Sequence, residues 1–157
     1  MEQVYSKKCD SIEQTALLAK LFASAIKDSG CFVNLYGEIG AGKTAFVRLV
    51  AEALDIKEKV TSPSFTILNE YHTGIIPVYH FDLYRLENTG IKTIADELKE
   101  YSEDKCITFV EWAEFSQGEV PFDRIEINVT YDDNDNRCYE FKSVGEKYKD
   151  VILRMNK

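Results

Sequence analysis

Residues 37–44 read GEIGAGKT and match the pattern G-x-x-x-x-G-K-[ST]. The pattern is informative only where a buried strand precedes it and a helix follows it. Residues 31–36 read CFVNLY, which is apolar almost throughout and rich in β-formers, so they predict a strand covered on both faces. Apolar side chains at helical spacing then predict a helix over residues 45–54. The sequence therefore predicts a strand, a glycine-rich loop and a helix in direct succession.

This loop has the residue types that a phosphate cradle needs. Glycines let the backbone wrap closely around a phosphate so that successive N–H groups point inward. Lys43 offers an ammonium group to the β and γ phosphates, and the Thr44 hydroxyl can ligate Mg²⁺ at the positive end of the following helix. The flanking elements favour this cradle over the alternative, an ordinary tight turn with Lys43 at the surface. The predicted nucleotide-binding residues are Gly37, Glu38, Ile39, Gly40, Ala41, Gly42, Lys43 and Thr44.

Two acids stand at the ends of β-rich runs. Asp82 ends the run VYHFD (residues 78–82), and Glu111 ends CITFVE (residues 106–111). Parallel sheets gather ligands at the carboxyl ends of their strands, and Mg²⁺ on two phosphates needs a hard carboxylate, directly or through water. Each acid alone would be interpreted as a cap or a solvated turn residue, but beside a phosphate cradle both are predicted to serve the metal. We interpret His80, on the same strand face as Asp82, as a core histidine and not as a ligand.

The rest of the chain alternates further helices and strands. Ser11 and Gln14 have the spacing of a capping box, which opens a helix predicted to run up to Gly30. We also predict an antiparallel hairpin of residues 65–71 and 75–81, a helix over 91–99, strands over 124–130 and 137–143 joined by the turn 132–136, and a short helix near Val151. The predicted fold class is α/β: a single domain over residues 1–157 in a P-loop NTPase-like three-layer fold, with a mixed, mainly parallel central sheet and a C-terminal β-hairpin.

The composition is that of an acidic globular domain. Hydrophobic residues make up 45% and charged residues 29% of the 157 residues, which excludes a disordered or rod-like chain. The net charge of −8 makes the surface repel phosphate backbones and anionic membranes. No apolar run approaches the roughly 20 residues of a membrane span, and no signal-peptide pattern is present. The four cysteines include no CxxC pair, so zinc-finger spacing is excluded and a reducing, cytoplasmic setting is expected.

Four blocks of sequence together resemble the TsaE family, the small bacterial P-loop ATPases of tRNA threonylcarbamoyladenosine synthesis. They are LYGEIGAGKT at 35–44, TSPSFTILNEY at 61–71, YHFDLYRL at 79–86 and FVEW at 109–112. The resemblance implies a cytoplasmic protein that binds and slowly hydrolyses ATP with Mg²⁺. It also implies action with the TsaD and TsaB proteins, which transfer threonylcarbamoyl from its adenylate to the adenosine beside the anticodon. Contact with tRNA is then expected only through that complex.

The resemblance also assigns roles to single residues. Lys43 is the P-loop lysine and Thr44 the magnesium threonine, while Glu111 and Asp82 are the acids expected near Mg²⁺. Lys43, Asp82 and Glu111 form the predicted catalytic set. Residues 61–64 occupy the place of a nucleotide-sensing switch, in which Ser64 replaces the more usual threonine. Three residues without a sharp motif lie where the adenine pocket is expected: Asp10, Ser11 and Arg137.

The sequence leaves other functions open. A small-molecule or nucleotide kinase uses the same loop but needs a mobile lid that carries arginines, and no arginine-rich stretch is present. A GTP switch is disfavoured because the chain lacks an [NT]KxD motif. A non-hydrolysing interaction module also fits the loop. No arginine is clearly placed to neutralise the transition state, apart from Arg85 as a candidate internal donor, so we expect slow turnover that partners stimulate.

Overall fold

The strand predicted before the glycine-rich loop lies in the middle of a seven-stranded sheet. The computed structural model describes residues 3–38, 40–63, 66–86, 95–103, 105–115 and 119–157. The strands of this part follow one another in the order β1-β7-β6-β2-β5-β4-β3. They are β1 (Val4–Cys9), β2 (Cys31–Tyr36), β3 (Leu68–Tyr71), β4 (Val78–Asp82), β5 (Ile107–Glu111), β6 (Arg124–Tyr131) and β7 (Arg137–Val144). The helices are α1 (Ile12–Ile26), α2 (Lys43–Ala53), α3 (Ala95–Glu103) and α4 (Lys149–Met155), with short 3₁₀ turns at Tyr84–Leu86 and Ala113–Phe115.

The sheet is mixed, with parallel pairs at its centre and antiparallel pairs at its two sides. β2 pairs in parallel with β6 and β5, and β5 pairs in parallel with β4. The pairs β1–β7, β6–β7 and β3–β4 are antiparallel. Parallel and antiparallel pairs are equal in number among the described strands. The predicted parallel pairing is therefore found in the central strands and not across the whole sheet. The carboxyl ends of β2, β4 and β5 consequently meet at one edge of the sheet, where ligand sites of α/β folds form.

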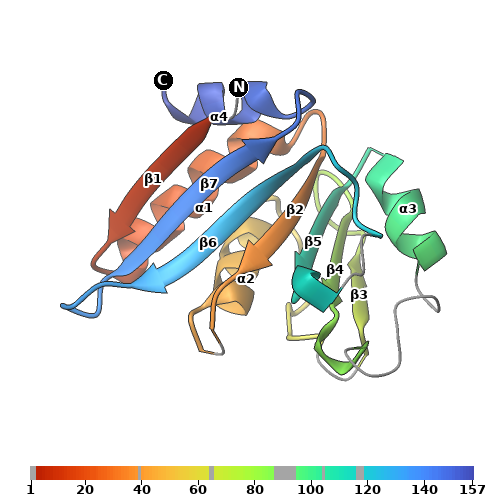
Figure 1. Ribbon diagram of the computed structural model, residues 1–157, viewed down its shortest axis with the longest axis horizontal. Coiled ribbons are helices and arrows are strands. Elements are labelled where there is room, and N and C mark those ends of the chain that lie inside the picture. The colour runs from red at the N-terminus through yellow and green to blue at the C-terminus, as the bar shows by residue number, and fades with distance from the viewer. Residues whose placement is uncertain (1–2, 39, 64–65, 87–94, 104, 116–118) are drawn as a thin grey trace.

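Helices cover both faces of the central strands (Figure 1). On one face, Phe46 of α2 contacts Tyr139 of β7 with ring centroids 5.1 Å apart, and α1 packs beside α2. On the other face, Tyr101 of α3 stacks on Tyr79 of β4 at 3.8 Å. Neighbouring residues of a strand point to opposite faces, so His80 points to the side of α2. These layers confirm the predicted three-layer α/β fold.

Several element boundaries follow local signals in the sequence. The Ser11 hydroxyl accepts a hydrogen bond from the Gln14 backbone N–H at 3.2 Å, and the Gln14 side chain accepts one from the Asp10 N–H at 3.0 Å. This cap starts α1, which ends at Ile26, before the predicted limit at Gly30, because the chain already turns there and the Gly30 N–H donates to the Ile26 carbonyl at 2.8 Å. β2 occupies the predicted residues, and β3 and β4 form the predicted antiparallel hairpin. Predictions that fall on residues 64–65 and 91–94 lie outside the described residues.

β1 is a strand that the sequence pattern did not predict. Its residues VYSKKC show no apolar alternation, and only Cys9 among them is buried. The strand lies at the edge of the sheet and pairs with β7 from Val4↔Lys142 to Cys9↔Arg137. Backbone pairing holds such an edge strand, so side-chain periodicity carries little signal for it.

Two further expectations concern the cysteines and the membrane. None of the four cysteines forms a disulfide, and Cys31 and Cys106 are buried, as expected for small apolar thiols. Among the described residues, the structure has no helix with the length and apolar character needed to cross a lipid bilayer.

Candidate functional site

The glycine-rich loop leaves β2 and enters α2 through backbone conformations that favour glycine. Gly37 has φ = 153°, and Gly42, the N-cap of α2, has φ = 104°. A Cβ atom on Gly37 would come within 2.8 Å of the Val129 carbonyl oxygen, and one on Gly42 within 2.9 Å of the Arg137 guanidinium. The turn therefore favours glycine at both positions; the backbone of β6 also requires it at Gly37, whereas at Gly42 only the end of the Arg137 side chain would have to shift. The loop ends at the N-terminus of α2, where backbone N–H groups and the helix dipole favour an anion.

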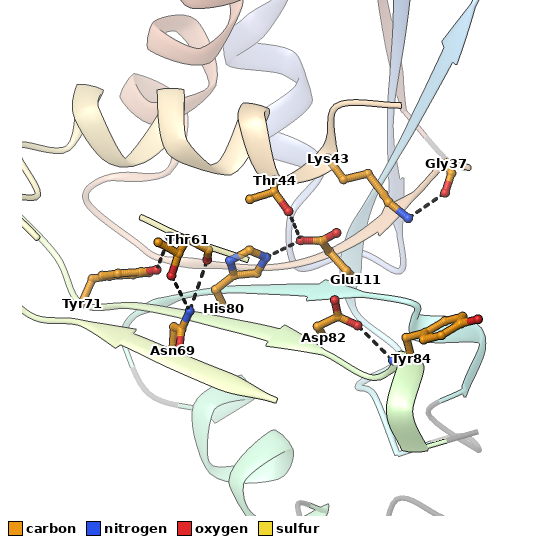
Figure 2. Close-up of polar contacts among 10 residues, drawn as sticks. All are labelled: Gly37, Lys43, Thr44, Thr61, Asn69, Tyr71, His80, Asp82, Tyr84 and Glu111. Carbon is orange, nitrogen blue, oxygen red and sulfur yellow. Dashed lines mark hydrogen bonds and ion pairs between the residues drawn. The ribbon is translucent and has the colours of Figure 1, made fainter. Parts of the chain in front are cut away.

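The Lys43 side chain folds back over the loop (Figure 2). It is only 6% exposed, and its Nζ donates a hydrogen bond to the Gly37 carbonyl at 2.6 Å. The same Nζ lies 4.2 Å from the centre of the Trp112 ring, a cation–π contact. Trp112 directly follows Glu111 and has φ = 60°, so the chain turns sharply there. Trp112 stacks on Phe115 and also covers the loop ammonium.

Glu111 joins the loop to the tip of β5. Its Oε2 accepts a hydrogen bond from Thr44 Oγ1 at 2.9 Å and one from His80 Nε2 at 2.6 Å (Figure 2). The residue is only 4% exposed. Burial raises the pKa of Glu111, but the contacts with His80 and Thr44 and the charge of Lys43 outweigh it, so its pKa lies below its ordinary value. The carboxylate is consequently ionised at neutral pH.

Asp82 lies next to Glu111 at the same edge of the sheet. The two are register partners in the parallel pair of β4 and β5. Asp82 is 4% exposed, and its Oδ1 accepts a hydrogen bond from the Tyr84 backbone N–H at 3.0 Å. The structure thus brings both predicted acids to the strand tips, with Glu111 in direct contact with Thr44 and Asp82 beside it (Figure 2).

The oxygen atoms gathered here fit a magnesium ion. The Thr44 hydroxyl and the carboxylates of Glu111 and Asp82 are hard donors, and no cysteine lies among them. Among the described residues, no group of three or more His, Cys, Asp or Glu side chains is arranged to hold a metal by itself. Mg²⁺ in phosphate-transfer sites commonly relies on one or two carboxylates together with the phosphates of its substrate. The donor set is therefore of the kind that holds Mg²⁺ together with a nucleotide.

His80 is the site residue that the sequence reasoning set aside. It is fully buried, as a core histidine would be, but its Nε2 contacts Glu111. The interpretation as a core histidine is therefore confirmed, and the hydrogen bond to Glu111 adds a contact that the sequence did not predict. Its position on the same face as Asp82 could be predicted from the strand period. Its partner could not, because that contact depends on which strand lies beside β4.

The C-terminal hairpin of β6 and β7 supports the loop from one side. The Tyr131 hydroxyl donates to the Gly40 carbonyl at 3.0 Å and accepts from Arg137 Nε at 3.3 Å. A hollow of about 390 Å³ lies between hairpin and loop, lined by Gly37, Glu38, Ala41, Val129, Thr130 and Tyr131. A second cavity, of about 200 Å³, is lined by Cys9, Asp10, Ser11, Ile12, Thr15, Asp135 and Arg137. It brings together all three residues that the resemblance associates with the adenine pocket.

Thr61, the first residue of the predicted switch block, is held against β3 by side-chain hydrogen bonds. The Tyr71 hydroxyl accepts from the Thr61 backbone N–H at 3.3 Å, and the Asn69 amide donates to the Thr61 carbonyl at 3.2 Å (Figure 2). Asn69 is the register partner of His80 in the pair of β3 and β4. This segment therefore connects with the strand that carries His80 and Asp82. Its role as a nucleotide-sensing switch stays a prediction.

Three residues of the sequence analysis lie outside what the structure describes. Ile39 of the loop and Ser64 of the switch block are outside the described residues, and so is the side chain of Arg85. Their predicted roles stay predictions.

Comparisons with known proteins agree with this arrangement. A family model described as "Threonylcarbamoyl adenosine biosynthesis protein TsaE" matches residues 9–139. A "tRNA threonylcarbamoyladenosine biosynthesis protein TsaE" of Bacillus subtilis is 38% identical over 137 residues, covering 87% of this chain and 84% of that protein. A protein of the same description from Nostoc sp. is 36% identical over 128 residues, covering 79% and 77%. The crystal structure of Bacillus subtilis YdiB is similar with a TM-score of 0.83 at 32% identity, covering 99% of this chain and 96% of that chain.

Proposed function

The chain belongs to the TsaE family of tRNA threonylcarbamoyladenosine biosynthesis proteins, and from this premise we propose that it binds ATP with Mg²⁺ and hydrolyses it slowly in support of that modification. One observation supports the proposal most directly. The hydroxyl of Thr44, at the start of α2, donates to the buried carboxylate of Glu111 at 2.9 Å. This contact places a loop hydroxyl and a strand-tip acid side by side, as a magnesium-nucleotide site requires.

Each residue of the site has its own proposed role. Thr44 and Glu111 would hold Mg²⁺, which when bound neutralises charge on the β and γ phosphates. The Lys43 ammonium, now on the Gly37 carbonyl, stabilises negative charge on the phosphates together with the loop N–H groups. Asp82 accepts a hydrogen bond from a water molecule and so orients it, or from the hydration shell of the metal.

The base of the nucleotide is proposed to occupy the cavity lined by Asp10, Ser11 and Arg137. Its volume of about 200 Å³ is below the 300–1,000 Å³ of pockets that hold whole ligands, so it suits one ring system. Arg137 also touches Tyr131, which bonds to the loop at Gly40. The cavity and the loop are therefore next to each other, as the two ends of one nucleotide require.

We propose that TsaD and TsaB are the partners, in the cytoplasm, and that tRNA is reached only through them. The resemblance to the TsaE family supports the choice of partners. The net charge of −8 supports the indirect contact, because an acidic surface repels the tRNA backbone. Slow intrinsic turnover fits a site that a partner completes, since an arginine supplied by another chain is worth about 10³ to 10⁵ in rate.

A thermal melt with and without ATP and Mg²⁺ tests the binding step. A ligand at 100 times its dissociation constant adds about 2.7 kcal/mol to the native state, which in a domain of this size raises Tm by about 5–10 °C. We expect that shift for the wild-type protein and almost none for Lys43→Ala. The absence of a wild-type shift, or an equal shift in both proteins, would contradict the proposed site.

Turnover measurements test the chemical step and separate it from the kinase alternative. With TsaD and TsaB present, we expect ATP hydrolysis that falls strongly in Lys43→Ala and in Glu111→Ala. Near-normal hydrolysis in both variants would refute the roles given to these residues. Phosphoryl transfer to a nucleoside or a metabolite, in place of water, would favour a kinase.

A further inference from the structure

His80 makes the shortest side-chain contact to the proposed metal-binding carboxylate. Its Nε2 lies 2.6 Å from Glu111 Oε2, and both side chains are buried, with 0% and 5% of their surface exposed. An ionised carboxylate only accepts hydrogen bonds, so Nε2 carries the proton and donates it. The other ring nitrogen, Nδ1, is buried without a hydrogen-bond partner among the described residues. The imidazole is therefore oriented by one polar contact, the one with Glu111.

The position of this contact follows from the sheet. His80 pairs with Phe109 in the register of β4 and β5, and Asp82 pairs with Glu111 two residues further on. Residues two apart on a strand share a face, so His80 and Glu111 are diagonal neighbours on the side of α2. A histidine here reaches the end of the Glu111 side chain. The imidazole is thus held by two central strands, which are more rigid supports than a loop.

Two donors converge on one of the two carboxylate oxygens. Thr44 Oγ1 and His80 Nε2 both donate to Oε2 of Glu111. Figure 2 shows the second oxygen turned away from both donors, and no described residue donates a hydrogen bond to it. A free glutamate side chain has several rotamers, and the pair of donors selects one of them. The unused oxygen is then presented in one direction at the strand tip.

We propose that His80 is a positioning residue for magnesium binding: it holds the Glu111 carboxylate so that the carboxylate can serve Mg²⁺ beside Thr44. This inference rests on the proposed function. His80 makes no contact with the nucleotide in this proposal and acts only through Glu111. Replacing a group that holds a metal ligand in this way typically lowers the metal affinity about 10- to 100-fold.

Three variants of His80 test the inference. For each one, calorimetry measures the Mg²⁺ concentration at which the enhancement of ATP binding is half-maximal. His80→Gln can place an amide N–H near the position of Nε2, whereas His80→Asn is too short to reach Glu111, and His80→Leu has no donor. We expect His80→Asn and His80→Leu to raise the half-saturating Mg²⁺ concentration about 10- to 100-fold and His80→Gln to stay close to wild type. Binding of ATP without metal should be unchanged in all three. His72→Leu, at an exposed histidine whose ring contacts Glu70 and Tyr79, is the matched control.

A measurement on the unmodified protein makes the test independent of whether the variants fold. The chain has only two histidines, so ¹⁵N-histidine labelling yields two imidazole spectra that are easy to assign. We expect His80 to show the Nε2–H tautomer with a slowly exchanging proton, because the ring is fully buried. Mg²⁺ added with ADP should shift the His80 signals and leave those of His72 in place.

The outcomes separate this inference from the function on which it rests. If the wild-type protein does not bind ATP with Mg²⁺, the proposed function fails. If it binds, but His80→Asn and His80→Leu need no more Mg²⁺ than wild type, His80 is only a packing residue. An Nδ1–H tautomer of His80, or His80 signals that do not shift when Mg²⁺ is added, would overturn the inference even if no variant folds.

Discussion

The hydroxyl of Thr44 provides the contact by which the loop meets β5, and Thr44→Val removes it with little change of shape. Valine keeps the branching of threonine, so helix propensity changes little. The lost hydrogen bond joins Oγ1 to a buried carboxylate at 2.9 Å. Hydrogen bonds to charged groups contribute about 1.5–3 kcal/mol. His80 still donates to the same oxygen in the variant, so we expect a loss near the lower end, about 1.5–2 kcal/mol.

Thermal unfolding without nucleotide measures this loss. In a domain of this size, 1 kcal/mol shifts Tm by about 2–4 °C, so Thr44→Val should melt about 3–8 °C below wild type. Thr44→Ser is the control, because it keeps the hydroxyl and removes one half-buried methyl group, worth at most about 0.8 kcal/mol. Equal melting temperatures for the two variants would refute the energetic role of the contact.

The pH dependence of the same pair follows from the lowered pKa of Glu111. A carboxyl whose folded pKa is lowered contributes stability that is present above its unfolded pKa and is lost as the pH falls through its folded pKa. The difference in Tm between Thr44→Val and Thr44→Ser should therefore be full at pH 7 and should shrink as the pH falls below about 4. A difference that grows on acidification would show that the hydroxyl does not interact with the charged form.

Three further predictions concern the loop, the thiols and the surface charge. Gly42→Ala should lower the free energy of unfolding by about 1–2 kcal/mol and displace Arg137. Gly40→Ala should carry only the backbone cost, because the added Cβ meets no atom within 4 Å. Urea denaturation measures both, and a Gly40→Ala variant less stable than Gly42→Ala would refute this prediction. In the native protein, a thiol reagent should modify the partly exposed Cys138 first and Cys31 last, because Cys31 is buried and its burial raises its pKa; mass spectrometry of the modified peptides shows the order. The isolated chain should not bind tRNA tightly at physiological salt, and tight binding in a filter assay would contradict the proposed indirect contact.

Local sequence carried most of the information about the central elements. The glycine-rich loop was placed between β2 and α2 because its glycines, the apolar run before it and the helical spacing after it are all signals within about 20 residues. Asp82 and Glu111 were found in the same way, as acids that end β-rich runs. Their convergence beside Thr44 followed from a general property of parallel strands, whose carboxyl ends meet at one edge of the sheet.

Other parts of the site had no local signal. The contact of His80 with Glu111 requires β4 and β5 to be neighbours in the right register, although 31 residues separate the two side chains in the chain. The support of Gly40 by Tyr131 spans 91 residues. β1 joins the sheet mainly by backbone pairing, with Tyr5 and Cys9 as its contacts with the core, and these two residues are too few to give a side-chain pattern.

By itself, the sequence predicted which residues would serve a phosphate and a metal and on which kind of element each one stands, because those predictions depend on side-chain type and on spacing along one segment. Only the tertiary structure decided that His80 holds Glu111, that Trp112 covers Lys43, and that Arg137 closes over Gly42. These contacts join segments far apart in the chain. Their geometry depends on strand order and register, which the pairing of the whole sheet sets.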